Sequence, residues 1–145
     1  MKGRQLAEWV FSMLKQLEKK TSREKVIEIM EIDGRKSCTS GFKNTIRKLK
    51  SKSETTKDFI EHLQEHYKKS SFFEYVNEKE LISGHSKCYM MIKSASKPVE
   101  TDLFCYFCLG HGKEFYETAF NKSVIGEIVD TVMKGGNNCK FRYRI

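Results

Sequence analysis

The chain has 145 residues, of which 39% are hydrophobic and 32% charged, and its formal net charge is +8. This length suits one domain with a core of its own, so a disulfide framework is not required. The sequence contains no apolar run long enough to cross a bilayer, and its start, MKGRQLAEWVF, is not a signal-peptide pattern. We therefore expect a cytoplasmic protein, with residues 1–145 in a single domain and its cysteines reduced.

Positive charge is concentrated in the first half of the chain. Residues 1–70 carry 17 Lys and Arg against 10 Asp and Glu, whereas residues 71–145 carry 10 against 9. The segment 35–52 is basic and contains no acidic residue. No aromatic interleaving, helix-turn-helix pattern or RNA-binding motif accompanies it, so we expect a solvated helical face and no dedicated nucleic-acid function.

Residues 1–70 have the apolar spacing of amphipathic helices. An apolar stripe runs from Leu6 to Leu17, and Thr21 and Glu24 then have the spacing of a capping box. The second helix is expected to end at Gly34. Two further helices are predicted, at about 39–50 and from Thr55 or Thr56 onward.

Residues 71–145 change to a strand-rich pattern. The last seven residues, CKFRYRI, alternate apolar and basic side chains, as a half-buried strand does. Gly110 and Gly112 break the preceding pattern, and KEFYETAF after them has helical spacing. The segment 72–76 is apolar and of uncertain type. The predicted strands are 86–93, 102–108, 123–133 and 139–145, with a hairpin turn at 135–138.

This order of elements predicts an α+β fold. The N-terminal helices would pack on a small antiparallel β-sheet, with one helix inserted before the final hairpin. A helical half, 1–70, and a strand-rich half, 71–145, would share one core.

The C-terminal segment FCYFCLGHGKEFYETAFNKSVIGEIVDTVMKGGNNCKFRYRI resembles a known ligand-binding fold. It is similar to 4-vinyl-reductase-like domains, to the family named for L-2-amino-thiazoline-4-carboxylate hydrolase, and to an uncharacterised cysteine-rich family. EIMEIDGRKSC at 28–38 is a second point of likeness to the cysteine-rich family. Subunits of a vesicle-tethering complex share the fold. The resemblance implies a small-molecule sensor or carrier, with thiazoline-ring hydrolysis as the enzymatic alternative.

The stretch CYFCLGHG at 105–112 holds the candidate chemistry. Cysteine and histidine are the usual zinc ligands, and a cysteine beside a histidine can also act as a nucleophile. Cys105, Cys108 and His111 are therefore the catalytic candidates. Core packing of the thiols is the third reading. The metal candidates are Cys38, Cys88, Cys105, Cys108, His111 and Cys139.

The glycine turn predicted at 110–113 would open a helix, and its free backbone N–H groups would face an anionic ligand group. We expect a pocket between sheet and helices for a small, mainly apolar ligand with an anionic end. Its predicted ligand-binding residues are Phe104, Tyr106, Gly110, His111, Lys113, Phe115, Phe141 and Tyr143.

Two alternatives stay open beside this ligand-binding reading. One is a metal- or thiol-dependent hydrolase of a cyclic C–N or C–S substrate, and the other is a protein-interaction adaptor with a structural zinc. We also expect a homodimer formed through the N-terminal helices, where Trp9 lies on the apolar stripe.

Overall fold

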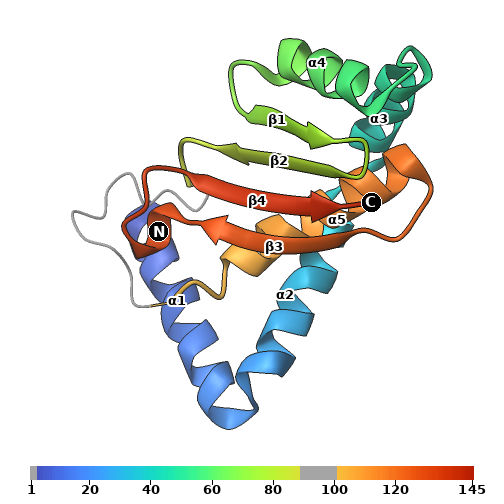
Figure 1. Cartoon of the computed structure of the whole chain (residues 1–145). Coiled ribbons are helices and arrows are strands. Elements are labelled where there is room, and N and C mark those ends of the chain that lie inside the picture. Colours follow the sequence, from blue (N-terminus) through green and yellow to red (C-terminus); the bar gives the residue numbers. More distant parts are fainter. Residues whose placement is uncertain (1–2, 89–100) are drawn as a thin grey trace.

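The computed structural model describes residues 3–88 and 101–145 and has the predicted α+β architecture (Figure 1). Helices come first, then a sheet, and one helix precedes the final hairpin. The elements are α1 (Gly3–Lys20), α2 (Arg23–Ser37), α3 (Ser40–Ser51), α4 (Thr56–Tyr67), β1 (Phe72–Asn77), β2 (Glu80–His85), α5 (Cys105–Phe120), β3 (Ile125–Asp130), the 3₁₀ helix η2 (Val132–Lys134) and β4 (Cys139–Arg144).

The four strands form one antiparallel sheet in the order β1-β2-β4-β3. The last strand, β4, lies between β2 and β3, with Leu81 opposite Tyr143 and Ile128 opposite Phe141. Its alternation is as predicted: Cys139, Phe141 and Tyr143 are buried. The inner face of the sheet is therefore aromatic along β4, the strand that pairs with both β2 and β3.

The inner face of the sheet packs on α5, and α2 packs along α5 on the side away from the sheet (Figure 1). Two glycines allow the helices to meet. A methyl group at Gly34 would overlap the backbone carbonyl of Phe107, and one at Gly110 would overlap that of Glu31. The two backbones therefore lie closer than any side chain would permit.

The structure differs from four of the sequence predictions. The strand predicted at 102–108 is wrong, because residues from Cys105 onward form the first two turns of α5. Gly34 does not end a helix, since α2 continues to Ser37. The third strand ends at Asp130 rather than at 133, and η2 follows it. Of the strand predicted at 86–93, residues 86–88 are not extended in a sheet and 89–93 lie outside the described residues.

The capping box predicted from Thr21 and Glu24 does not form. Ser22, rather than Thr21, caps α2, and its side chain accepts a hydrogen bond from the Lys25 backbone N–H. The hairpin of β1 and β2 contains a strand, Glu80–His85, that the sequence did not predict. No helix within residues 3–88 and 101–145 combines the length and the apolar character needed to span a membrane.

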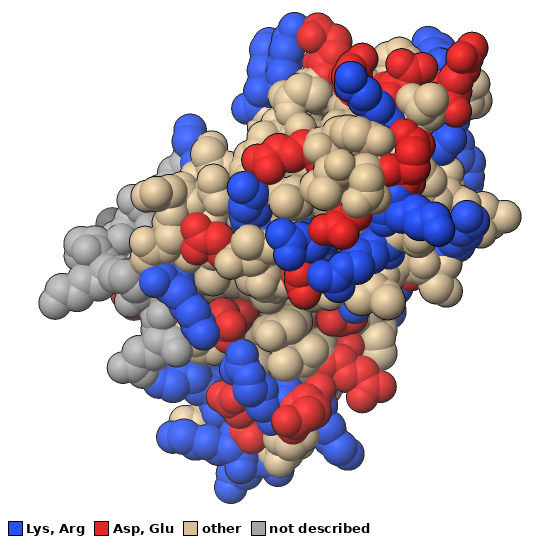
Figure 2. Space-filling model, viewed as in Figure 1, with Lys and Arg blue, Asp and Glu red and all other residues tan. Residues whose placement is uncertain are grey.

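The outer face of the sheet is ion-paired, although β4 alone reads as basic. Arg142 lies 3.1 Å from Glu80 and 3.2 Å from Glu127, and Lys140 lies 3.3 Å from Glu74. Figure 2 shows acidic and basic side chains interspersed over this view of the molecule. The basic alternation of β4 is therefore neutralised by acids on β1, β2 and β3.

Candidate functional site

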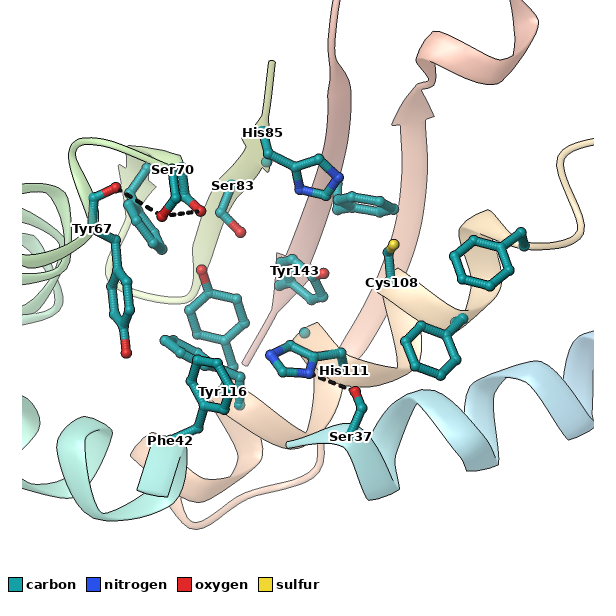
Figure 3. A pocket seen from close by; sticks show the side chains of 18 residues that line it. Ser37, Phe42, Tyr67, Ser70, Ser83, His85, Cys108, His111, Tyr116 and Tyr143 are labelled. Carbon is teal, nitrogen blue, oxygen red and sulfur yellow. Dashed lines mark hydrogen bonds between the residues drawn. The ribbon is translucent and has the colours of Figure 1, made fainter. Parts of the chain in front are cut away.

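A pocket of about 630 Å³ lies between α5 and the inner face of the sheet (Figure 3). The ends of α2 and α4 and the start of α3 complete its wall. Its lining is dominated by aromatic rings. The lining residues are Ser37, Phe42, Tyr67, Ser70, Ser71, Phe73, Ser83, Gly84, His85, Phe104, Phe107, Cys108, His111, Gly112, Phe115, Tyr116, Phe141 and Tyr143.

One stripe of α5 supplies much of the wall. Phe104, Cys108, His111 and Phe115 follow one another three or four residues apart, so they share a helix face. Gly112 belongs to the same face, and a methyl group there would overlap the Tyr143 ring. The glycine thus leaves room for a tyrosine of the sheet to lie against the helix.

The Tyr116 hydroxyl is a deeply buried polar group of the pocket wall. Tyr116 is 1% exposed, and its hydroxyl forms no hydrogen bond of standard geometry with any described residue. The Ser83 hydroxyl is close enough to favour its ionised form slightly, but burial dominates and raises the pKa of Tyr116. The phenol therefore stays protonated across the physiological range.

Two histidines border the pocket from opposite sides (Figure 3). Nδ1 of His111 is hydrogen-bonded to Oγ of Ser37 at 2.8 Å, and the His111 ring meets Phe42 edge-on at 5.2 Å. Burial lowers the pKa of His111. Burial and, less strongly, the charge of His111 lower the pKa of His85 to about 4. Both imidazoles are therefore neutral at pH 7.

The predicted anion-binding turn is wrong. Gly110, His111 and Lys113 lie inside α5, where their backbone groups belong to the helix, and not at its start. The ammonium of Lys113 pairs with Glu31 at 2.7 Å and does not line the pocket. Among the described residues that line the pocket there is no Asp, Glu, Lys or Arg.

The remaining predicted ligand-binding residues lie partly in the pocket wall and partly outside it. Phe104, His111, Phe115, Phe141 and Tyr143 all line the pocket. Tyr106 faces away from it and lies under the Arg23 guanidinium, and Gly110 faces α2.

Sequence reasoning missed Phe42 on α3, Phe107 and Tyr116 on α5, and the lining residues on β1, β2 and the ends of α2 and α4. Helical spacing over 104–116 would have identified Phe107 and Tyr116 beside the residues of α5 that were predicted. The remaining missed residues give no sequence signal, because only the tertiary fold brings them together.

The cysteines do not form the predicted reactive group. Burial raises the pKa of Cys105 to about 12 and that of Cys38 to about 11, and it also raises the pKa of Cys108. Cys105 Sγ lies 3.0 Å from Thr131 Oγ1 and 3.3 Å from Met133 Sδ, inside a small apolar cluster. These thiols are protonated at pH 7 and pack as small apolar side chains.

No zinc-type ligand set exists in the described part of the chain. Within residues 3–88 and 101–145, no three His, Cys, Asp or Glu side chains are grouped so that they could hold a metal ion. Cys38 is buried with α3, α4 and Tyr67, whereas Cys105 lies with α1 and η2. Cys88, Cys105, Cys108 and Cys139 lie near enough for their charges to affect one another's pKa, but they are not grouped as a set of metal ligands within the described residues.

A family model matches residues 1–144, and the chain belongs to that family, which is described as a family of unknown function (DUF6144). No curated protein matches the chain. This match gives no direct evidence for the 4-vinyl-reductase-like or hydrolase-named families, so the resemblance to those two stays a hypothesis.

Solved structures with the same fold span almost the whole chain. One is a trafficking protein particle complex subunit 3 from Naegleria fowleri, covalently bound to palmitic acid, with a TM-score of 0.57 and 15% identity over 98% of this chain and 93% of that one. Another is the phenol-responsive sensory domain of the transcription activator PoxR, with phenol, at a TM-score of 0.60 and 11% identity over 99% of this chain and 74% of that one. At these identities the likeness establishes the fold.

Proposed function

We propose that this protein binds a small, mainly apolar molecule between α5 and the sheet, as a sensor or carrier domain does. The observation that carries the proposal is the pocket of about 630 Å³ with its aromatic lining and no charged side chain. Ligand sites of drug-sized molecules have this size, an apolar wall and a few placed polar groups.

The fold relatives support the proposal. The two solved structures are with phenol and with covalently bound palmitic acid, one aromatic and one aliphatic, and both mainly apolar. A fold shared at low identity is a weak warrant for function by itself. The aromatic lining of this chain's own pocket supplies the independent support.

The direct test is binding of 2-acetylnaphthalene, measured by ligand-observed NMR, to the wild-type protein and to a variant with a filled pocket. Cys108→Phe adds a ring to the α5 wall and should weaken binding at least tenfold. Glu65→Phe is the matched control, because the Glu65 side chain is 76% exposed on α4 and does not line the pocket. No binding to wild type, or equal binding to both variants, would overturn the proposal.

We also propose that two copies pair through α1. Ala7, Phe11 and Leu14 bury one face of this helix against the domain, while an apolar stripe on another face stays exposed. The stripe consists of Leu6, Trp9, Met13 and Leu17, and Trp9 is 56% exposed.

The stripe is self-complementary when two copies of α1 run antiparallel. Leu6 of one copy then faces Leu17 of the other, and Trp9 faces Met13, because both pairs are centred near Phe11. A two-fold interface requires this kind of self-matching patch. A second copy is therefore the occupant that the stripe fits.

Sedimentation equilibrium tests the pairing. Wild type should sediment at twice the chain mass at micromolar concentration, and Trp9→Lys at the chain mass. Ser12→Lys, an exposed position on α1 beside the stripe, is the matched control and should remain dimeric. A monomeric wild-type protein would exclude this interface.

A further inference from the structure

We infer that the ligand is a neutral, mainly apolar compound with a hydrogen-bond acceptor, such as a carbonyl oxygen, and that the Tyr116 hydroxyl donates to that acceptor. This inference rests on the proposed ligand-binding function and names the chemical class that the pocket selects.

The first argument is the state of the Tyr116 hydroxyl. It borders the pocket, is buried, and points toward Ser83 in Figure 3 without a hydrogen bond of standard geometry to any described residue. A buried hydroxyl whose hydrogen bond is poorly formed costs free energy, and native proteins rarely leave one so without a reason. An acceptor atom on a bound ligand would remove that cost.

Second, the position of the Tyr116 hydroxyl is fixed, because neighbouring rings hold the Tyr116 ring in place. The Tyr116 ring lies 4.7 Å from the Tyr143 ring and 5.1 Å from the Phe115 ring, the latter in an edge-to-face contact. These neighbours hold the ring in the pocket wall, so the hydroxyl has a fixed place beside Ser83. A donor that is held in place before binding loses little entropy when the ligand arrives.

The third argument concerns the charge of the ligand. The described lining residues include no Lys or Arg, and both His85 and His111 are neutral at pH 7 because burial lowers their pKa values. A carboxylate or phosphate would therefore lose its hydration without gaining a cation. The phenol of Tyr116 stays protonated, so it acts as a donor to a neutral acceptor.

Three naphthalene derivatives of nearly equal size test this chemistry in ligand-observed NMR competition. They are 2-acetylnaphthalene, with a neutral acceptor, 2-ethylnaphthalene, without one, and 2-naphthoate, an anion. The wild-type protein should bind the acetyl compound about tenfold more tightly than the ethyl compound, which is the size expected of one net hydrogen bond. The naphthoate should bind more weakly than either.

Tyr116→Phe removes only the hydroxyl. This variant should bind the acetyl and ethyl compounds equally, with the affinity for the ethyl compound unchanged within about twofold. Tyr75→Phe is the matched control, since the Tyr75 hydroxyl donates to Glu78 at 2.9 Å and Tyr75 does not line the pocket, so this variant should keep the wild-type preference.

Unfolding of the ligand-free variant supplies a second readout. Because Tyr116→Phe removes a buried hydroxyl that forms no hydrogen bond of good geometry, its unfolding midpoint should equal or exceed that of wild type. A clearly lower midpoint would show that the hydroxyl is already satisfied within the protein and would overturn the inference.

The binding outcomes separate the inference from the proposed function. Equal wild-type affinity for the acetyl and ethyl compounds would refute the acceptor while leaving an apolar ligand pocket in place. Tightest binding of 2-naphthoate would refute a neutral ligand. Binding of none of the three would overturn the proposed function together with the inference.

Discussion

The crossing of α2 and α5 makes a quantitative prediction, because two glycines bring the helix backbones together. Gly110→Ala would place a methyl group against the backbone of Glu31. A backbone atom cannot rotate aside as a side chain can, so the helices must separate along their length.

The magnitude follows from two opposing effects. Overpacking in a close-packed interior typically costs about 1–3 kcal/mol. Replacing glycine by alanine within a helix returns up to about 1 kcal/mol. We therefore expect Gly110→Ala to lower the free energy of unfolding by about 1–2 kcal/mol, and Gly34→Ala to do the same.

Urea denaturation followed by circular dichroism measures this change. Gly41→Ala in α3 is the matched control, because a methyl group at Gly41 meets nothing closer than the Thr39 hydroxyl at 3.9 Å. This control should leave stability unchanged or raise it. If Gly110→Ala instead raised stability as a solvent-exposed helical glycine would, the close crossing of α2 and α5 would be refuted.

Two further predictions concern titratable groups in the core. His85 has a folded-state pKa of about 4, below its ordinary value, so the unfolded state binds the proton first. The free energy of unfolding should therefore fall as the pH falls from about 6.5 toward 4, by at most about 3 kcal/mol. Urea midpoints at pH 7 and pH 5 should therefore differ less in His85→Gln than in wild type, and an equal difference would contradict the shift. Cys38 and Cys105, with pKa values of about 11 and 12, should resist maleimide at pH 8 in the native protein and react on unfolding, as read by peptide mass spectrometry. Labelling of native Cys105 within minutes would show that it is accessible and ionised.

The architecture followed from local patterns in the sequence. Helical spacing predicted α1 to α4, and the alternation in residues 139–145 predicted both the strand and its buried face. These signals succeed because each element buries a single face, and that face has the period of the element.

The prediction of a strand and a turn at residues 105–112 was wrong for a physical reason. Aromatic residues and two glycines suggested a strand followed by a turn, and local propensity favours that interpretation. In the fold the small size of Gly110 and Gly112 matters instead, since one admits the α2 backbone and the other admits Tyr143. Tertiary packing of this kind overrides propensity and cannot be read from local sequence.

The candidate site was predictable in its location and not in its polar chemistry. A pocket between sheet and helices followed from the order of elements and the family resemblance. The placement of Lys113 in an ion pair with Glu31, and of Tyr116 in the pocket wall, depends on the helical phase of α5. The error in the secondary structure of residues 105–112 therefore accounts for the anionic end that the sequence analysis gave to the ligand.

The most direct test of the account maps where an apolar molecule binds. Isotope-labelled protein would be titrated with 2-acetylnaphthalene, and the backbone and aromatic NMR shifts followed residue by residue. We predict that the shifts concentrate on α5, β2 and β4, with the largest changes at Tyr116, His111 and Ser83. Shifts concentrated on the exposed stripe of α1, or spread evenly over the surface, would contradict a ligand pocket between α5 and the sheet.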